Sequence, residues 1–134
     1  MIYSSVVVDL VQPNNMTKVN AVKGDTGRGL YIYLKADGQQ ITSSQVSSPA
    51  LYVKRPDDAI YSSNGTFVAN QNYFRVDLTE DMLGIAGECK AVVGAGTGQN
   101  VITSPEFTIV VHDNFTVIDL DPEVVDSEDP LSGN

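Results

Sequence analysis

The sequence contains no tryptophan, one cysteine and one histidine. A single cysteine excludes an intrachain disulfide, and an unpaired cysteine is most often a small core residue, so we expect Cys89 to be buried. The lone histidine, His112, has no serine or cysteine partner in a recognisable catalytic context and gives no triad. We expect it to be a polar residue at a strand end.

Basic residues are also scarce, because 8 Lys and Arg stand against 17 Asp and Glu, a net charge of −9. Nucleic acids and anionic membranes attract clustered bases, so neither is an expected partner. No apolar run approaches the ~18 residues of a membrane-spanning helix. The N-terminus lacks a basic segment and Asp9 interrupts its apolar stretch, so we expect neither a signal peptide nor membrane insertion.

The negative charge is concentrated at the C-terminal end. Residues 113–134 hold seven Asp and Glu and no Lys or Arg, which leaves residues 1–112 nearly neutral. Apolar residues are embedded among these acids, where a purely solvating tail would not need them. We therefore expect a folded domain over 1–112 and an acidic tail or linker over 113–134, with an interface segment formed by Phe115, Val117, Ile118 and Leu120.

The apolar residues present recur at every second position, in short segments separated by turn residues. About seven or eight such segments, each with one dry face and one wetter face, indicate an all-β fold in which antiparallel sheets pack face to face. The expected core residues are Leu30, Ile32, Leu34, Phe74, Val76, Leu78, Phe107 and Ile109.

Glycine, proline and asparagine clusters mark the turns. Asn64-Gly65 favours a two-residue hairpin, since both residues tolerate positive φ. The glycine-rich stretch 94–98 predicts a flexible hairpin loop. Residues 79–86 break the alternation: Thr79 suits a helix N-cap and Gly87 a helix end, so a short helical plug is expected between two strands.

The stretch "GDTGRG" at 24–29 is glycine-rich, but it leads into a predicted strand and lacks the lysine of a phosphate loop. We expect a structural bend in which Asp25 accepts backbone hydrogen bonds or pairs with Arg28. No cofactor is expected there or elsewhere.

Two groups of acidic residues are candidate chemical sites. Asp57, Asp58, Glu80 and Asp81 could in principle supply paired carboxylates, but nothing fixes their separation. Asp119, Asp121, Glu123 and Asp126 lack the glycine and terminal glutamate of a calcium loop. We expect no metal site and no catalytic residues.

Four stretches in order resemble the N-terminal domain of the phage baseplate upper protein family: "KGDTGRGLYIYL" (23–34), "LYVKRPDDAIYSSNG" (51–65), "VDLTEDMLGIAGECKAVV" (76–93) and "VITSPEFTIVV" (101–111). The turn at Arg55-Pro56-Asp57-Asp58 departs from the family pattern because it lacks the usual glycine. Family members also usually continue into long C-terminal regions.

The resemblance implies an immunoglobulin-like sandwich with a structural role in the virion. Such a domain would dock on the central hub of a tail-tip baseplate and project host-recognition parts such as a receptor-binding protein. It would be made in the bacterial host cytoplasm, and homo-oligomerisation is left open. The alternative is a carbohydrate-binding or adhesion module that uses Tyr31, Tyr33, Tyr52 and Tyr73, which fall on the wetter strand faces.

Overall fold

The computed structural model describes residues 1–69 and 71–113, and this part of the chain is all-β. Its strands are β1 (Ile2–Asp9), β2 (Lys18–Val22), β3 (Arg28–Ala36), β4 (Gln39–Gln40), β5 (Ser47–Lys54), β6 (Ile60–Asn64), β7 (Thr66–Phe67), β8 (Tyr73–Asp77), β9 (Gly87–Thr97), β10 (Asn100–Thr103) and β11 (Phe107–His112).

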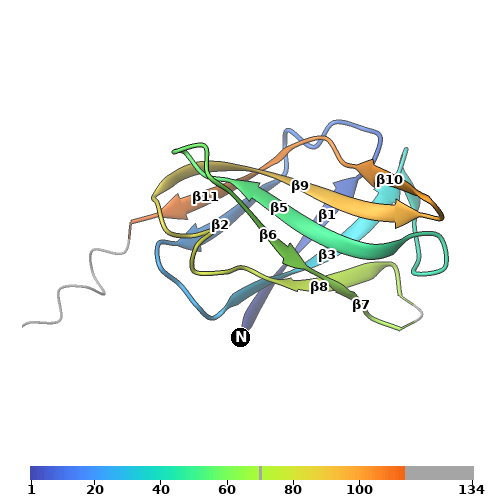
Figure 1. The fold of residues 1–134 in the computed structure, drawn as a ribbon, viewed down its shortest axis with the longest axis horizontal. Coiled ribbons are helices and arrows are strands. Elements are labelled where there is room, and N and C mark those ends of the chain that lie inside the picture. The colour runs from blue at the N-terminus through green and yellow to red at the C-terminus, as the bar shows by residue number, and fades with distance from the viewer. Residues whose placement is uncertain (70, 114–134) are drawn as a thin grey trace, which may run out of the picture.

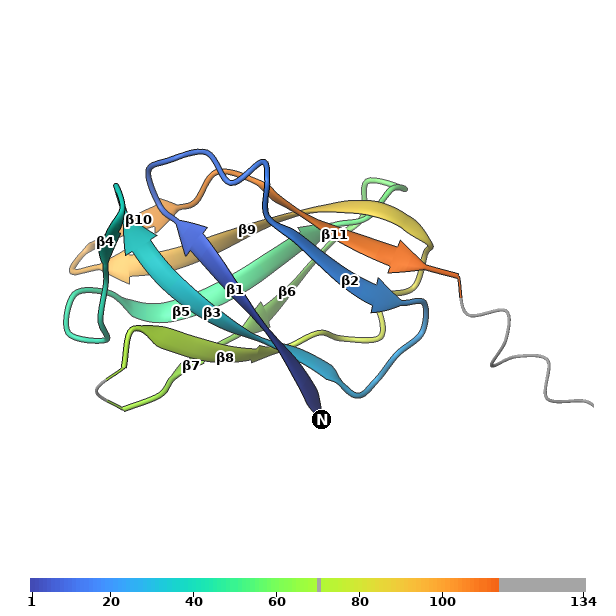
Figure 2. The same ribbon diagram turned by 180° about the vertical axis from the view of Figure 1, so that it is seen from behind.

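Two sheets pack face to face. Sheet A has the strand order β1-β3-β8-β7, with β4 also paired to β3, and sheet B has the order β2-β11-β9-β5-β6, with β10 also paired to β9. Figure 1 shows β9, β5 and β6 of sheet B toward the viewer, and Figure 2 shows β1 and β3 of sheet A from the other side. The expected β-sandwich is therefore observed.

Both sheets are mixed, so the expectation of purely antiparallel sheets is wrong. β1 runs parallel to β3, and β2 runs parallel to β11, while the remaining pairs are antiparallel. Alternating burial reports which face of a strand is dry but carries no information about the direction of its neighbour.

The core lies between the sheets, where the period of two predicted it. All eight expected core residues are buried, with at most 3% of their surface exposed. Cys89 is also fully buried, beside Ala91 and Val93 on the inward face of β9. The prediction of the core is thus confirmed.

Residues 79–86 form a single turn, and the predicted helical plug is wrong. Thr79 does act as a cap, because its hydroxyl accepts a hydrogen bond from the Met82 amide at 3.2 Å. The Leu83 amide then bonds the carbonyls of Thr79 and Glu80 at 3.3 and 3.2 Å, and the turn ends. Met82 and Leu83 are fully buried, so packing holds the segment although it is too short for a stable helix.

Asn64-Gly65 does not form the predicted hairpin. It is the point where the chain passes from β6 in sheet B to β7 in sheet A. Gly65 has no positive φ there; its requirement is space, since a Cβ on Gly65 would collide with the Phe74 ring. Glycine at position 65 is therefore explained by close packing against Phe74 and not by the backbone conformation of a turn.

The glycine-rich stretch 94–98 is also not the predicted loop. Gly94 to Thr97 belong to β9, and the two-residue turn to β10 is Gly98-Gln99. The Tyr52 ring of β5 lies against Gly94, 3.0 Å from where a Cβ would stand. The absence of a side chain at Gly94 therefore allows the Tyr52 ring to pack against β9.

Candidate interaction surfaces

The loop that precedes β3 holds three parts of the sandwich together. The Arg28 Nε–H donates to Asp25 Oδ2, so the structure places these two side chains side by side. The Ile2 amide bonds the Gly27 carbonyl, the Lys23 amide bonds the His112 carbonyl and the Gly24 amide bonds the Leu83 carbonyl, each at 2.8 Å. These contacts make the segment 23–28 a structural clasp between the start of β1, the end of β11 and the 79–86 turn.

Two of the candidate paired carboxylates, Asp57 and Asp58, form ion pairs with different bases, Arg55 and Lys54. Asp57 accepts two hydrogen bonds from Arg55, at 3.0 and 2.6 Å, and this bonding holds the pKa of Asp57 below its usual value. Arg55 also donates to the Asp81 carbonyl at 3.0 Å and lies over the Tyr61 ring. Arg55 thereby links the β5–β6 turn to the 79–86 turn, with the Asp57 carboxylate as its ion-pair partner.

The remaining candidate chemical residues are also tied into the fold. His112 Nε2 lies 3.0 Å from Asn20 Oδ1, across the β2–β11 pair. Burial raises the pKa of the Cys89 thiol. Within 1–69 and 71–113, no group of three or more His, Cys, Asp and Glu side chains is arranged to hold a metal ion, and no helix is long and apolar enough to cross a membrane.

Several predicted residues lie outside the described part of the chain. These are the interface residues Phe115, Val117, Ile118 and Leu120 and the acids Asp119, Asp121, Glu123 and Asp126.

A row of four tyrosines crosses the outer face of sheet A, from β1 over β3 to β8. Tyr3 stacks on Tyr31 at a ring-centroid distance of 4.6 Å, Tyr31 meets Tyr73 edge-on at 5.5 Å, and Tyr73 stacks on Tyr33 at 4.6 Å. Such pairs stabilise a sheet surface beyond the area that they bury. The structure thus brings together three of the predicted tyrosines, while Tyr52 lies on sheet B.

Tyr3 is the member of this tyrosine row that the sequence reasoning missed. Its hydroxyl donates to Asp77 Oδ1 at 3.1 Å, and partial burial together with this carboxylate raises the pKa of Tyr3. The available signal was the alternation in residues 2–10, where Tyr3 falls opposite in phase to the buried Val6 and Val8.

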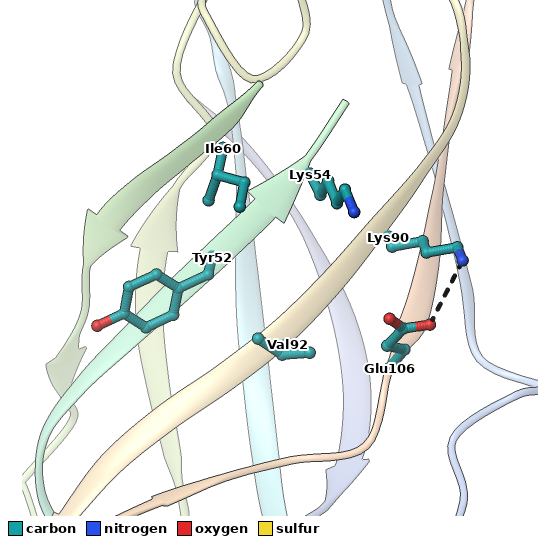
Figure 3. Close-up of a pocket in the computed structure, with 6 residues that line it drawn as sticks. All are labelled: Tyr52, Lys54, Ile60, Lys90, Val92 and Glu106. Atoms are coloured by element: carbon teal, nitrogen blue, oxygen red, sulfur yellow. Dashed lines mark ion pairs between the residues drawn. The ribbon is translucent and has the colours of Figure 1, made fainter. Parts of the chain in front are cut away.

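The outer face of sheet B carries a shallow hollow, which we call the sheet B hollow (Figure 3). Its lining residues come from four segments and are Tyr52, Lys54, Ile60, Lys90, Val92 and Glu106. Lys90 and Glu106 form a 4.0 Å ion pair at one side. Ile60 is 64% exposed and Tyr52 41% exposed, so apolar surface faces solvent beside the charged side chains of Lys54, Lys90 and Glu106.

The buried carboxylate of Asp9 bonds several backbone amides at the end of the sandwich that lies away from the segment 23–28. It accepts amide hydrogen bonds from Val11, Gln12 and Gly38 at 2.8 Å and from Asp37 at 3.0 Å. Burial alone would raise the pKa of Asp9, but these four donors lower it to about 2. Asp9 therefore joins the end of β1 to the turn between β3 and β4.

Comparison with known proteins gives a match in structure. No family model and no curated protein sequence matches the chain. The fold is similar to the N-terminal domain of ORF48 from phage TP901-1, with a TM-score of 0.67 and 15% sequence identity over 84% of this chain and 99% of that one. The chain therefore shares the fold of a phage protein domain.

Proposed function

We propose that this chain is a structural component of a phage tail-tip baseplate. In this role it docks on the central hub and projects host-recognition parts through protein–protein contacts, and it resides in the virion. The observation that carries the proposal is the fold match, which spans 99% of a phage protein domain. The four ordered stretches that resemble the baseplate upper protein family support it independently, and with it an immunoglobulin-like classification of the sandwich.

The sheet B hollow is the best candidate for the docking surface. Interfaces typically combine an apolar centre, often with tyrosine, and a polar rim. Ile60, Tyr52 and Val92 supply such a centre, and Lys54, Lys90 and Glu106 supply the rim. The tyrosine row is less suited to this task, because its rings already contact one another.

Co-purification with the hub and receptor-binding proteins of the same phage or prophage tests the proposal. The chain should co-purify with the hub, and Ile60→Lys should abolish the complex by placing a charge in the apolar centre. Val101→Lys is the matched control, because Val101 is 79% exposed on β10, away from the hollow. If the two variants behave alike, the hollow is not the docking surface; if the wild-type chain binds no baseplate protein, the function is wrong.

Carbohydrate binding remains the second candidate, favoured by the gathering of Tyr3, Tyr31, Tyr73 and Tyr33 on one face. A sugar ring would need a free aromatic face, and the stacked pairs Tyr3–Tyr31 and Tyr33–Tyr73 each cover one face of their rings. Glycan-array binding that Tyr31→Ala removes would favour this second function over the first.

The proposal includes no catalytic activity. Asp57 is paired with Arg55 and burial raises the pKa of the Cys89 thiol, so we expect neither to act as a free base or nucleophile. Turnover of any substrate by the purified chain would contradict this part of the proposal.

A further inference from the structure

Strand β1 forms one edge of sheet A, and its free side is open. The Ile2 amide bonds Gly27 and the Leu10 amide bonds Lys35, both on the β3 side. In a strand, backbone groups point alternately to the two sides, so the even-numbered residues of β1 face β3. The amides and carbonyls of Tyr3 and Ser5 therefore point away from the sheet, toward a position where another strand could pair.

The β1 edge lacks the features that normally protect an edge strand from pairing. Residues 1–8, "MIYSSVVV", contain no Lys, Pro or charged side chain. Their register with β3 runs without a bulge from Ile2 to Asp9. By contrast, β2 at the edge of sheet B is shorter and begins with Lys18. Of the edges in the described residues, β1 is thus the long, uncharged and regular one.

Apolar side chains are also exposed along β1. Ile2 is 70% exposed and Val7 48% exposed, and Met1 is exposed beside them. These residues alternate between the two faces of the strand, so a flat partner that bonded the backbone would cover them on both faces. The open backbone and the exposed side chains therefore point to one kind of occupant, an added strand.

We propose that this occupant is β1 of a second copy of the chain, paired antiparallel about a two-fold axis at Ser4. In this register Tyr3 and Ser5 exchange backbone hydrogen bonds with Ser5 and Tyr3 of the other copy. In each of these two pairs the large Tyr3 side chain lies opposite the small Ser5 side chain of the other copy. Ile2 packs beside Val6 and Met1 beside Val7 of the second copy, which covers the exposed apolar residues.

The far end of β1 limits the choice of register. Asn14 already satisfies the Asp9 amide and carbonyl at 2.9 Å, and the Thr17 hydroxyl lies 3.5 Å from the Val7 carbonyl. A strand centred near Val7 would meet these groups, whereas one centred at Ser4 leaves them in place. The open stretch is therefore short and lies toward the N-terminal end of β1.

The β1 edge suits a partner strand without charged side chains, and β1 of a second copy is such a strand. A chain with a net charge of −9 repels its own copies, so self-association is best placed where no acid lies. No side chain of residues 1–8 is charged, so this segment meets the condition and offers a basic partner no carboxylate. The contact is small, so we expect a weak dimer with a Kd on the order of 10 µM to 1 mM.

Proline at position 5 gives the sharpest test. The Ser5 amide faces the free edge, so Ser5→Pro removes a donor that the monomer does not use. Sedimentation of the full chain up to about 1 mM should show a dimer that Ser5→Pro weakens at least tenfold. The unfolding midpoint of the variant monomer should stay near that of the wild type. A wild-type chain that remains monomeric, or a dimer unaffected by Ser5→Pro, would overturn the proposal.

A charge placed on the edge provides a second variant that does not change the backbone. Val7→Lys puts two cations beside the new contact and should also weaken the dimer. Val101→Lys, the same substitution at an exposed position of β10, should leave the dimer intact. Equal effects from the two lysines would show that net charge, and not the β1 edge, controls association.

Cross-linking tests the register itself. A two-fold axis at Ser4 brings its two Cβ atoms about 5 Å apart, within reach of a disulfide after small adjustment, so Ser4→Cys should form a dimer on oxidation. Ser5→Cys is the matched control, since its two copies lie diagonally and too far apart. Faster cross-linking of Ser5→Cys than of Ser4→Cys would contradict this arrangement.

Discussion

The Tyr3 ring lies directly over the backbone of Gly29. Tyr3 belongs to β1 and Gly29 to β3, and the missing side chain of Gly29 lets the ring cross β3 and reach Asp77 on β8. A Cβ on Gly29 would collide with the ring and would stand 2.9 Å from the Val76 carbonyl. The absence of a side chain at Gly29 thus allows the Tyr3 side chain to link β1, β3 and β8 of sheet A.

Gly29→Ala should destabilise the protein by about 1–3 kcal/mol, the usual cost of overpacking a filled site. Gly27→Ala is the control, because a Cβ at Gly27 meets nothing within 4 Å. Urea unfolding of both variants measures the difference. If the two alanines cost the same, the contact between Tyr3 and Gly29 does not constrain the fold.

Asp9→Asn should remove an acid-sensitive part of the stability. The pKa of Asp9 is lowered in the folded state from 3.8 to about 2, so its carboxylate stabilises the fold above about pH 4 and loses this effect as the pH falls toward 2. The shift corresponds to about 2 kcal/mol. Unfolding free energies from pH 7 to 2 should therefore fall less steeply for Asp9→Asn than for the wild type or for the exposed-site control Glu80→Gln.

Ile32→Ala should cost about 2–5 kcal/mol, because the Ile32 side chain is fully buried between the sheets and its removal leaves a cavity. Val101→Ala, at an exposed site of β10, should change the stability by less than about 0.5 kcal/mol. Denaturant midpoints at a constant m-value would measure both, and a small loss for Ile32→Ala would mean that its packing is loose.

Asp58→Gly should leave the protein as stable as before or stabilise it by up to about 1 kcal/mol. Asp58 adopts a φ of 70°, which costs a residue with a side chain more than it costs glycine. Its ion pair with Lys54 is exposed and 3.7 Å long, so little is lost. Asp57→Gly, one position earlier, should instead lower the stability because it removes the pair with Arg55. The reverse order in thermal unfolding would refute this account of the turn.

The sequence alone predicted the layers of the fold well. Alternation identified the buried faces of β3, β8 and β11, because burial on one side of a strand leaves a direct mark on residue type. It also anticipated that Thr79 would cap the segment 79–86, although the capped turn does not continue as a helix, and it left open whether Asp25 would bond backbone amides or Arg28.

Features that depend on distant segments could not be read in this way. The parallel partners of β1 and β2, the crossing at Gly65 and the assembly of the tyrosine row are set by which strands meet, and no local pattern records that. Asn64-Gly65 shows the limit: the same dipeptide suits a turn or a tight contact with Phe74, and only the packed neighbour distinguishes the two.

The parallel pair β2–β11 also bears on how the chain folds during synthesis. Lys18 pairs with Thr108, which a ribosome adds 90 positions later. Within the described residues β2 has no other strand partner, so its backbone stays unpaired until nearly the whole domain has been made. Contacts of such long sequence separation slow folding. Residues 18–22 therefore remain exposed to water until β11 has been made. The polar side chains of Lys18 and Asn20, which are exposed on β2, favour solvation of this segment in the meantime.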